Sequence, residues 1–175
     1  MCAKKTIRKL SPPESSRPHM PGYGLPKGTK GLLPWKWAED CLTKSHNYWI
    51  STVQPNGSPH TMIVWGLWLD RMFIFSTGRQ SRKARNLSAN PRCVICTEEA
   101  DHAVIVEGTA EETPDVALRR KFLDLCEKKY KFDMSSMSTD ILNLKEPIYV
   151  VHPTVAFGLD EKKTLNAATR WRFGK

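Results

Sequence analysis

The residues whose types and spacing could do chemistry are concentrated in residues 75–87. Three hydroxyl side chains surround a glycine turn there, Ser76, Thr77 and Ser81. Four basic residues follow or interrupt them, Arg79, Arg82, Lys83 and Arg85, and no acidic residue occurs from residue 77 to residue 97. Hydroxyl donors and a lysine–arginine pair are the groups that bind an anion such as a phosphate.

The expected local structure strengthens this reading. Residues 72–77 have the aromatic and β-branched composition of a strand, and residues 81–89 fit a short helix that stops before Asn90-Pro91. A helix N-terminus carries partial positive charge, so basic side chains placed there are disfavoured unless an anion lies between them. The chemistry therefore predicts a phosphate clamp, with a solvated basic helix capped by Ser81 as the alternative.

The remaining elements follow from periodicity and turn signals. Helices are expected over residues 34–44 and 113–131, and a polar loop with Met134 and Met137 follows the second helix. The Asn56-Gly57 pair favours a hairpin turn. Further strands are expected over residues 47–53, 59–68, 92–98, 103–111, 148–159 and 168–173, with Pro153 marking an edge or a bulge. This pattern predicts a mainly β protein, a barrel or sandwich of antiparallel strands with few short helices.

The chain has 175 residues, of which 40% are hydrophobic, enough for one domain with a core. Its net charge of +9 is unevenly distributed. Residues 1–33, rich in Pro, Gly, Ser and Lys, are expected to form a flexible basic arm, and residues 34–175 a domain that is nearly neutral. We therefore expect no nucleic-acid binding by the domain, and binding of an acidic partner by the arm stays an alternative.

No stretch approaches the ~20 apolar residues that span a bilayer, and no secretory signal precedes the domain, so a cytoplasmic location without membrane attachment is expected. Five cysteines argue for reduced thiols. Cys93 and Cys96 would point to opposite faces of a strand, and no second ligand pair accompanies them, so we expect no metal site.

Several of these motifs together resemble the FMN-binding split β-barrels of the pyridoxamine 5′-phosphate oxidase-like superfamily. The match consists of Ser76-Thr77, Ser81-Arg82-Lys83, Asn86-Leu87 and Asn90-Pro91. The preceding hairpin with Pro59-His60 and Trp65-Gly66 also fits, as does the downstream Val106-Glu107-Gly108. The resemblance covers roughly residues 40–173 and is specific as a combination, whereas each piece alone is weak.

The resemblance implies a six-stranded antiparallel split β-barrel with a few short peripheral helices, which forms a homodimer with the cofactor at the subunit interface. It implies a flavin-binding oxidoreductase with FMN as cofactor and a small-molecule substrate that the sequence does not identify. By position, the family's phosphate contacts fall on Ser76, Thr77, Ser81, Arg82 and Lys83. The strand beside the flavin ring falls on Thr61, Met62, Val64 and Trp65, and Trp171 and Arg172 are expected to reach the flavin from the partner subunit.

Two departures from the family pattern narrow the range of expected substrates. The family's glutamine falls at about Ala103, beside His102, and the expected Arg-Leu motif at the C-terminus is replaced by Thr169-Arg-Trp-Arg-Phe173. We therefore expect a substrate other than pyridoxamine phosphate, bound in a pocket with walls of Trp65, Trp68 and Trp171. Two alternatives stay open, an oxidoreductase that depends on the deazaflavin F420 and a non-catalytic flavin- or haem-binding protein.

Overall fold

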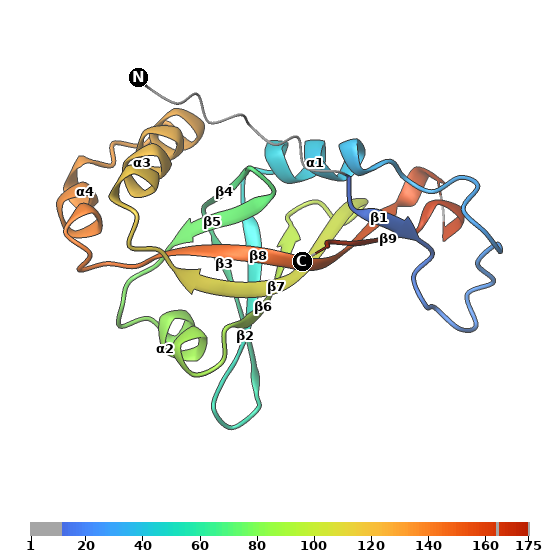
Figure 1. The fold of residues 1–175 in the computed structure, drawn as a ribbon, viewed down its shortest axis with the longest axis horizontal. Coiled ribbons are helices and arrows are strands. Elements are labelled where there is room, and N and C mark those ends of the chain that lie inside the picture. The colour runs from blue at the N-terminus through green and yellow to red at the C-terminus, as the bar shows by residue number, and fades with distance from the viewer. Residues whose placement is uncertain (1–11, 164, 175) are drawn as a thin grey trace, which may run out of the picture.

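The structure, a computed structural model, describes residues 12–163 and 165–174. These residues form one antiparallel sheet of nine strands that curls into a split barrel, with helices around it (Figure 1). The strands are β1 (Glu14–Ser16), β2 (Tyr48–Val53), β3 (Pro59–Val64), β4 (Gly66–Leu69), β5 (Met72–Ser76), β6 (Arg92–Thr97), β7 (His102–Glu112), β8 (Ile148–Asp160) and β9 (Thr169–Arg172). The helices are α1 (Trp35–Lys44), α2 (Arg82–Ala89), α3 (Val116–Tyr130) and α4 (Ser135–Leu142). The predicted fold class is confirmed.

The long strand β8 connects the two halves of the barrel. Its first residues pair with β5, its later residues pair with β9, and β7 runs along nearly its whole length. The ladder between β7 and β8 shifts register between Glu107 and Gly108, opposite Pro153, where the sequence predicted a bulge. Strands β3 and β4 each have a single partner, so hydrogen bonds do not close the barrel between them.

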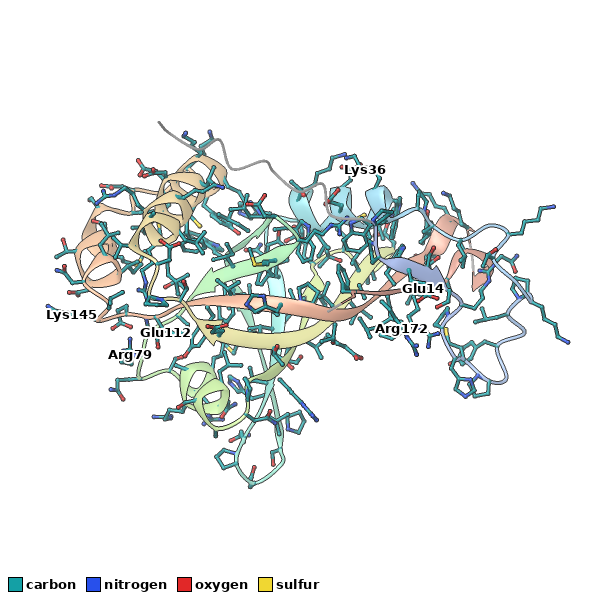
Figure 2. The ribbon with its side chains drawn as sticks, in the orientation of Figure 1. Glu14, Lys36, Arg79, Glu112, Lys145 and Arg172 are labelled. Carbon is teal, nitrogen blue, oxygen red and sulfur yellow. The ribbon has the colours of Figure 1, made fainter. Side chains whose placement is uncertain are left out.

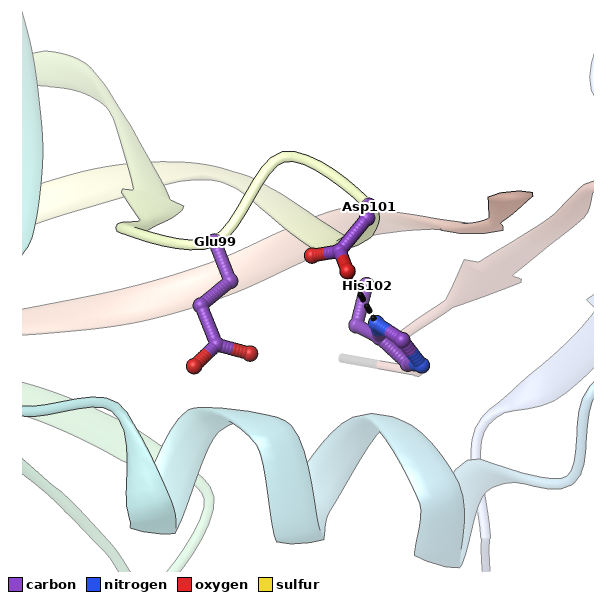
Figure 3. Close-up of side chains that lie close together, drawn as sticks. All are labelled: Glu99, Asp101 and His102. Atoms are coloured by element: carbon purple, nitrogen blue, oxygen red, sulfur yellow. Dashed lines mark ion pairs between the residues drawn. The ribbon is translucent and has the colours of Figure 1, made fainter. Parts of the chain in front are cut away.

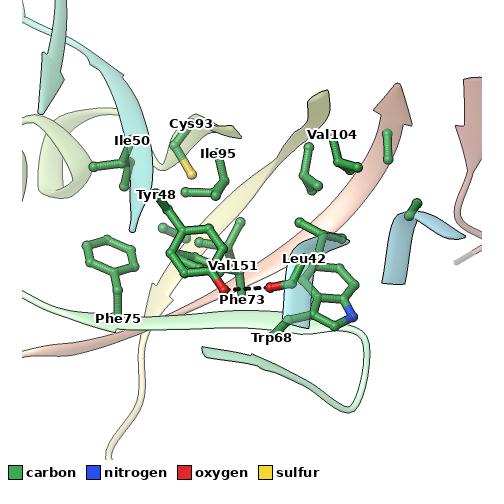
Figure 4. Close-up of a cluster of buried hydrophobic side chains, with 14 of the residues drawn as sticks. Leu42, Tyr48, Ile50, Trp68, Phe73, Phe75, Cys93, Ile95, Val104 and Val151 are labelled. Carbon is green, nitrogen blue, oxygen red and sulfur yellow. Dashed lines mark hydrogen bonds between the residues drawn. The ribbon is translucent and has the colours of Figure 1, made fainter. Parts of the chain in front are cut away.

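The barrel interior is the main hydrophobic core, and strict alternation along the strands builds it. In β2, Tyr48 and Ile50 are buried while Trp49 between them is exposed. Phe73 and Phe75 of β5 fill the same interior, where Tyr48 donates a hydrogen bond to the carbonyl of Leu42 (Figure 4). This core fixes the inward face of β2 and therefore decides which side chains of that strand face outward.

A second core lies on the opposite face of β5, under α3 and α4. Ile74 points into it, between the inward-facing Phe73 and Phe75. The helices contribute apolar side chains that include Phe122 and Ile141. The fully buried Arg119 joins the two helices, because its guanidinium donates to the carbonyls of Ile141 (2.7 Å) and Glu146 (2.8 Å). These contacts hold α4 against α3 near the end of β5.

The structure differs from the sequence prediction in three elements. The expected strand over residues 59–68 is divided into β3 and β4 at Trp65. The expected polar loop after α3 contains helix α4 instead, in which Met137 and Ile141 lie one turn apart and Met134 precedes the first turn. The helix expected from residue 113 begins at Val116 instead, because Asp115 is its N-cap: the Asp115 carboxylate accepts from the N–H groups of Ala117 (2.9 Å) and Leu118 (3.1 Å).

Part of the predicted N-terminal arm lies against the domain. Strand β1 pairs with β9, and the N–H of the buried Leu33 donates to Thr169 Oγ1 at 2.8 Å. Arg17 donates to the carbonyls of Gly28 (3.2 Å) and Ala168 (3.3 Å). Residues 1–11 of the arm lie outside the described residues. Within the described residues, no helix is long and apolar enough to cross a membrane.

Candidate cofactor site

The turn between β5 and α2, residues 76–83, brings the predicted hydroxyl residues together, and we call it the basic turn. Ser81 is the N-cap of α2, since its Oγ accepts from the N–H of Ala84 at 3.1 Å. Thr77 Oγ1 donates to the same Oγ at 3.1 Å. Ser76 uses its hydroxyl to bind the carbonyl of Pro147 at 3.1 Å, so this side chain holds the turn rather than pointing into open space.

Arg79 in the basic turn has a structural role. Its guanidinium donates to both carboxylate oxygens of Glu112, at 3.2 and 2.8 Å, and to the carbonyl of Lys145 at 2.6 Å. Its backbone N–H donates to Glu146 at 2.6 Å. Figure 2 shows Arg79, Glu112 and Lys145 together at the helical end of the molecule. Arg79 therefore fixes the turn against β7 and the segment after α4, and its charge is already neutralised.

Arg82 and Lys83 differ from Arg79 in this respect. Arg82 is exposed and Lys83 is half-buried, and no acidic side chain among the described residues pairs with either of them. Burial lowers the pKa of Lys83, as expected for an amine that no carboxylate compensates. Their backbone N–H groups also lack an acceptor in the described chain, because they lie in the first turn of α2. The first turn of α2 thus carries two cations without an acidic partner and two backbone N–H groups without an acceptor in the described chain.

His60 of β3 is close enough to sense this charge. Burial lowers its pKa first, and the positive charges of Arg82 and Lys83 lower it further. Its buried Nδ1 has no hydrogen-bond partner within the described residues. The region around the start of α2 is therefore electropositive, and an anionic, hydrogen-bonding group would stabilise it.

Strand β3 lies beside this spot and is open to solvent along one side. The register places Thr61 opposite Ser51 and Ile63 opposite Trp49, on the outward face. Met62 and Val64 face the barrel interior, opposite Ile50 and Tyr48, as the alternation predicted. Val64 is buried, whereas Met62 is 48% exposed, because β3 is at the edge of the sheet. The outward face of β3 with Trp49 is an exposed apolar surface of the kind that marks an interface.

The break between β3 and β4 is held by groups that the sequence did not reveal. The hydroxyl of Tyr130 accepts from the N–H of Gly66 at 2.7 Å and donates to its carbonyl at 2.9 Å. Lys129 donates to the same carbonyl at 3.1 Å and to the hydroxyl of Tyr48 at 2.9 Å. Glycine is required here, because a Cβ at Gly66 would lie 2.2 Å from the Phe73 ring. The ring of Trp65 stacks on Tyr130 at 4.4 Å.

A cavity of about 370 Å³ opens between the basic turn and the helical layer, and we call it the helix cavity. It is lined by Trp65, by Ser76, Thr77 and Gly78 of the basic turn, by Phe122 and Cys126 of α3, by Met134, and by Ser136, Met137, Asp140 and Ile141 of α4, with Glu146. Three predicted site residues therefore line the helix cavity, Trp65, Ser76 and Thr77. The sequence did not predict its far wall, although the spacing of Met134, Met137 and Ile141 is that of a helix face.

Two predicted wall residues lie elsewhere. Trp171 is fully buried in the barrel core, where its ring contacts Trp35 at 5.5 Å, and this burial leaves it no surface for a cofactor contact in the described conformation. Trp68 is also buried against Trp35, at 6.0 Å. Of the three predicted tryptophans, only Trp65 lines the helix cavity. Arg172 is exposed at the end of the sheet opposite to Arg79 (Figure 2), so within one chain it lies apart from the basic turn.

His102, beside the family's expected glutamine position, belongs to a different group. Its Nδ1 lies 3.2 Å from a carboxylate oxygen of Asp101, and Glu99 is nearby (Figure 3). The ligand atoms of these three residues lie within 4.8 Å of one another, but both carboxylates are exposed and His102 already pairs with Asp101. Exposed carboxylates of this kind commonly gather without an ion, and this group carries no functional assignment here.

Solved structures define the class of fold. A conserved hypothetical protein from Mycobacterium tuberculosis matches with a TM-score of 0.68 at 21% identity, over 79% of this chain and 92% of that protein. A protein named F420 reductase matches with a TM-score of 0.55 at 24% identity, over 74% and 98%. A haem-binding protein from Mycobacterium smegmatis matches with a TM-score of 0.53 at 18% identity, over 78% and 62%. These likenesses concern the fold alone.

Sequence comparison gives the family. The pyridoxamine 5′-phosphate oxidase family profile matches residues 35–147, and the chain belongs to this family. A pyridoxine/pyridoxamine 5′-phosphate oxidase from Anaeromyxobacter dehalogenans is 39% identical over 69 residues, which are 38% of this chain and 35% of that protein. The chain thus aligns with about a third of the length of that relative. The matched residues 35–147 include the basic turn, β3 and the α3 wall.

Proposed function

We propose that the chain is an FMN-binding oxidoreductase whose cofactor phosphate binds at the start of α2. The observation that carries this proposal is the pair Arg82 and Lys83, which has no acidic partner in the described chain although Arg79, three residues earlier, has one. Such a pair at a helix N-terminus is electrostatically unfavourable by itself, and a phosphate monoester reverses the sign of that contribution.

The residues present fit FMN in three ways. The phosphate would accept from Arg82 and Lys83, from the free N–H groups of α2, and from Thr77, whose hydroxyl needs only to rotate away from Ser81. The unpaired Nδ1 of His60 adds a further polar group at the same place. The backbone and outward face of β3, with Thr61 within the strand and Trp65 directly after it, would border the flavin ring.

A second copy of the chain would complete this site. β3 and the exposed Trp49, Ile63 and Trp65 form an apolar surface that a single chain leaves open to water. A homodimer that covers this surface would bury the flavin ring between two barrels and exclude water from it. Arg172, which lies apart from the basic turn of its own chain, would then come to the site from the partner, as the family resemblance implies.

Bound FMN would supply the redox chemistry, accepting and donating electrons, while the chain binds and orients the cofactor. Arg82 and Lys83 would anchor the phosphate, and β3 would hold the ring in a fixed position. Trp65, held on Tyr130, would form one wall of the substrate space. No side chain is assigned a proton-transfer step.

The test is the identity of the cofactor that copurifies with the chain, measured by absorbance and by mass after release. FMN in about one equivalent per chain supports the proposal, and added substrates that bleach the flavin absorbance would support catalysis. A chain that purifies colourless and does not take up FMN in titration contradicts it. A bound flavin that no donor reduces would indicate that the chain is a flavin-binding protein without catalytic turnover.

The deazaflavin F420 is the second candidate. The structural likeness to a protein named F420 reductase favours it, and F420 also carries a phosphate and an anionic tail that would suit the basic turn. Titration of the apoprotein with FMN and with F420 separates the two candidates, because the tighter-binding cofactor identifies the class. Oxygen consumption during turnover would favour FMN, since F420 transfers hydride only.

A further inference from the structure

The helix cavity has a composition that differs from that of the neighbouring phosphate spot. None of its twelve lining residues is a lysine, an arginine or a histidine. Its charged members are two carboxylates, Asp140 and Glu146. Asp140 pairs with Lys145 at 3.2 Å, and Glu146 accepts from the backbone N–H of Arg79 at 2.6 Å, but neither Lys145 nor Arg79 lines the cavity. A phosphate or carboxylate placed in it would therefore meet two carboxylates and no lining cation, which costs free energy. The cavity is therefore built to receive something other than an anion.

The inner surface of the helix cavity is apolar and already shaped. Phe122, Cys126, Met134 and Ile141 are each 5% exposed or less, so they form its floor. Burial also raises the pKa of the Cys126 thiol to about 12, so this side chain is a neutral, apolar surface near neutral pH. The packing of α3 on α4 through Arg119 holds this floor in place.

The mouth of the helix cavity is formed by Trp65 and Met137, which are 38% and 41% exposed. Sulfur atoms and an indole ring make favourable contacts with aromatic ligands. The volume of about 370 Å³ lies within the range of small-molecule pockets, which are largely apolar and have a few polar groups. It suits a compact ring compound rather than a peptide.

We propose that the helix cavity binds the organic substrate of the flavin site, and that this substrate is an uncharged aromatic molecule without a phosphate group. The inference rests on the proposed function, because it treats the bound molecule as the substrate of the flavin. The cavity lies beside the proposed phosphate site and shares Ser76, Thr77 and Gly78 with the basic turn. These shared residues lie between the start of α2, which would bind the phosphate of the cofactor, and the helix cavity, which would disfavour a phosphate on the substrate. The named reaction of the curated relative, by contrast, uses a phosphate-bearing substrate.

The experiment compares 1-naphthol with 1-naphthyl phosphate, a pair that differs only by the phosphate, by calorimetric titration of the FMN-loaded protein. We expect 1-naphthol to bind once per chain and at least about tenfold more tightly than its phosphate. Equal or tighter binding of 1-naphthyl phosphate would overturn the inference, as would failure of both probes to bind. Competition between FMN and 1-naphthol would place the cofactor itself in the cavity and would also overturn it.

Two pairs of variants locate the binding. Met137→Trp narrows the mouth and should weaken 1-naphthol binding by about tenfold or more, whereas Val116→Trp, an exposed apolar position on α3 outside the cavity, should leave it unchanged. Asp140→Lys should reduce the preference for 1-naphthol over its phosphate, and Asp124→Lys, an exposed acid outside the cavity, should not. Equal effects within either pair would show that the probe binds elsewhere.

FMN content, measured in every sample, keeps the two proposals separate. A chain that loads FMN but shows no preference for 1-naphthol retains the proposed function and loses the substrate inference. A chain that never loads FMN loses the proposed function, and the same titration without flavin still decides whether the helix cavity prefers the uncharged probe.

Discussion

The two faces of the basic turn, residues 76–83, present opposite chemistry within one short segment. On the α2 side lie Arg82 and Lys83, without acidic partners in the described chain, and the free N–H groups of a helix. On the α3–α4 side lies an apolar cavity whose only charges are carboxylates. The comparison shows that the end of one strand can have two chemically different sides, because a different helix packs on each side.

The two faces also differ in what stabilises them. The charges on the α2 side are not compensated by acidic side chains, so they contribute little to the stability of the fold. A bound anion would compensate them. The α3–α4 side is part of the second core and includes Phe122 and Ile141, whose burial stabilises the fold. Substitutions on the first face should therefore change binding, and substitutions on the second should change stability first.

The largest expected effect comes from Phe122→Ala in the floor of the helix cavity. Phe122 is 2% exposed, and its truncation should lower the free energy of unfolding by about 3–5 kcal/mol. Chemical denaturation would measure this loss. The preference for FMN over riboflavin should survive in the folded fraction, and its disappearance would show that the two faces are not independent.

A smaller effect is expected at the junction of the two faces, where Tyr130 holds Gly66. Tyr130→Phe leaves the buried N–H of Gly66 without its acceptor, which should cost about 1–3 kcal/mol of stability. It should also loosen Trp65, so that the intrinsic fluorescence of the protein changes and 1-naphthol binds less tightly. Unchanged stability would mean that water replaces the hydroxyl and that the junction is not held by it.

The smallest effect is a dependence on pH at the same junction. Burial lowers the pKa of Lys129 to about 8, below the ordinary lysine value of 10.5. Between these two values the unfolded chain binds more protons than the folded one, so the Lys129 contribution to stability increases as pH rises. Relative to Lys129→Met, the wild-type protein should gain at most about 1 kcal/mol per pH unit from pH 8 to pH 10.

Paired denaturation curves at several pH values would measure this difference, and Lys128→Met, which removes an exposed amine from the same helix, is the matched control. A difference that stays flat with pH, or that falls, would contradict a buried ammonium at the junction. Comparing differences between variants is necessary because burial raises the pKa of Cys93 and of Tyr130 above their ordinary values, so these groups add their own pH dependence to the free energy of unfolding in the same range.

Sequence reasoning predicted helix α2 and its Ser81 cap but expected a polar loop in place of helix α4, for a physical reason. The cap at Ser81 and the charges at Arg82 and Lys83 depend on residues that are neighbours in the chain, so their pattern is visible locally. Arg79 looks the same in sequence, but its partners Glu112 and Glu146 are 33 and 67 residues away. Only the fold shows which of these cations is neutralised.

The same limit applies to the barrel and its tryptophans. The aromatic and β-branched composition of β2 and β5 predicted these strands, because composition is a local property of the chain. Burial of Trp171 depends on its packing against Trp35, at the other end of the chain, and no local pattern signals it. The break at Gly66 depends on the hydroxyl of Tyr130, which is 64 residues away.

The central claim is that the phosphate of the cofactor binds Arg82 and Lys83, and it is tested most directly by the affinities of FMN and riboflavin, which differ by that phosphate. Flavin-fluorescence titrations would be made on the wild type, on the double variant Arg82→Ala/Lys83→Ala, and on Arg85→Ala as a control from the same helix. The account predicts that the double variant loses FMN affinity by about 100-fold or more while riboflavin binding is little changed, because charge-assisted hydrogen bonds are lost for FMN alone. An unchanged preference for FMN in the double variant would contradict it.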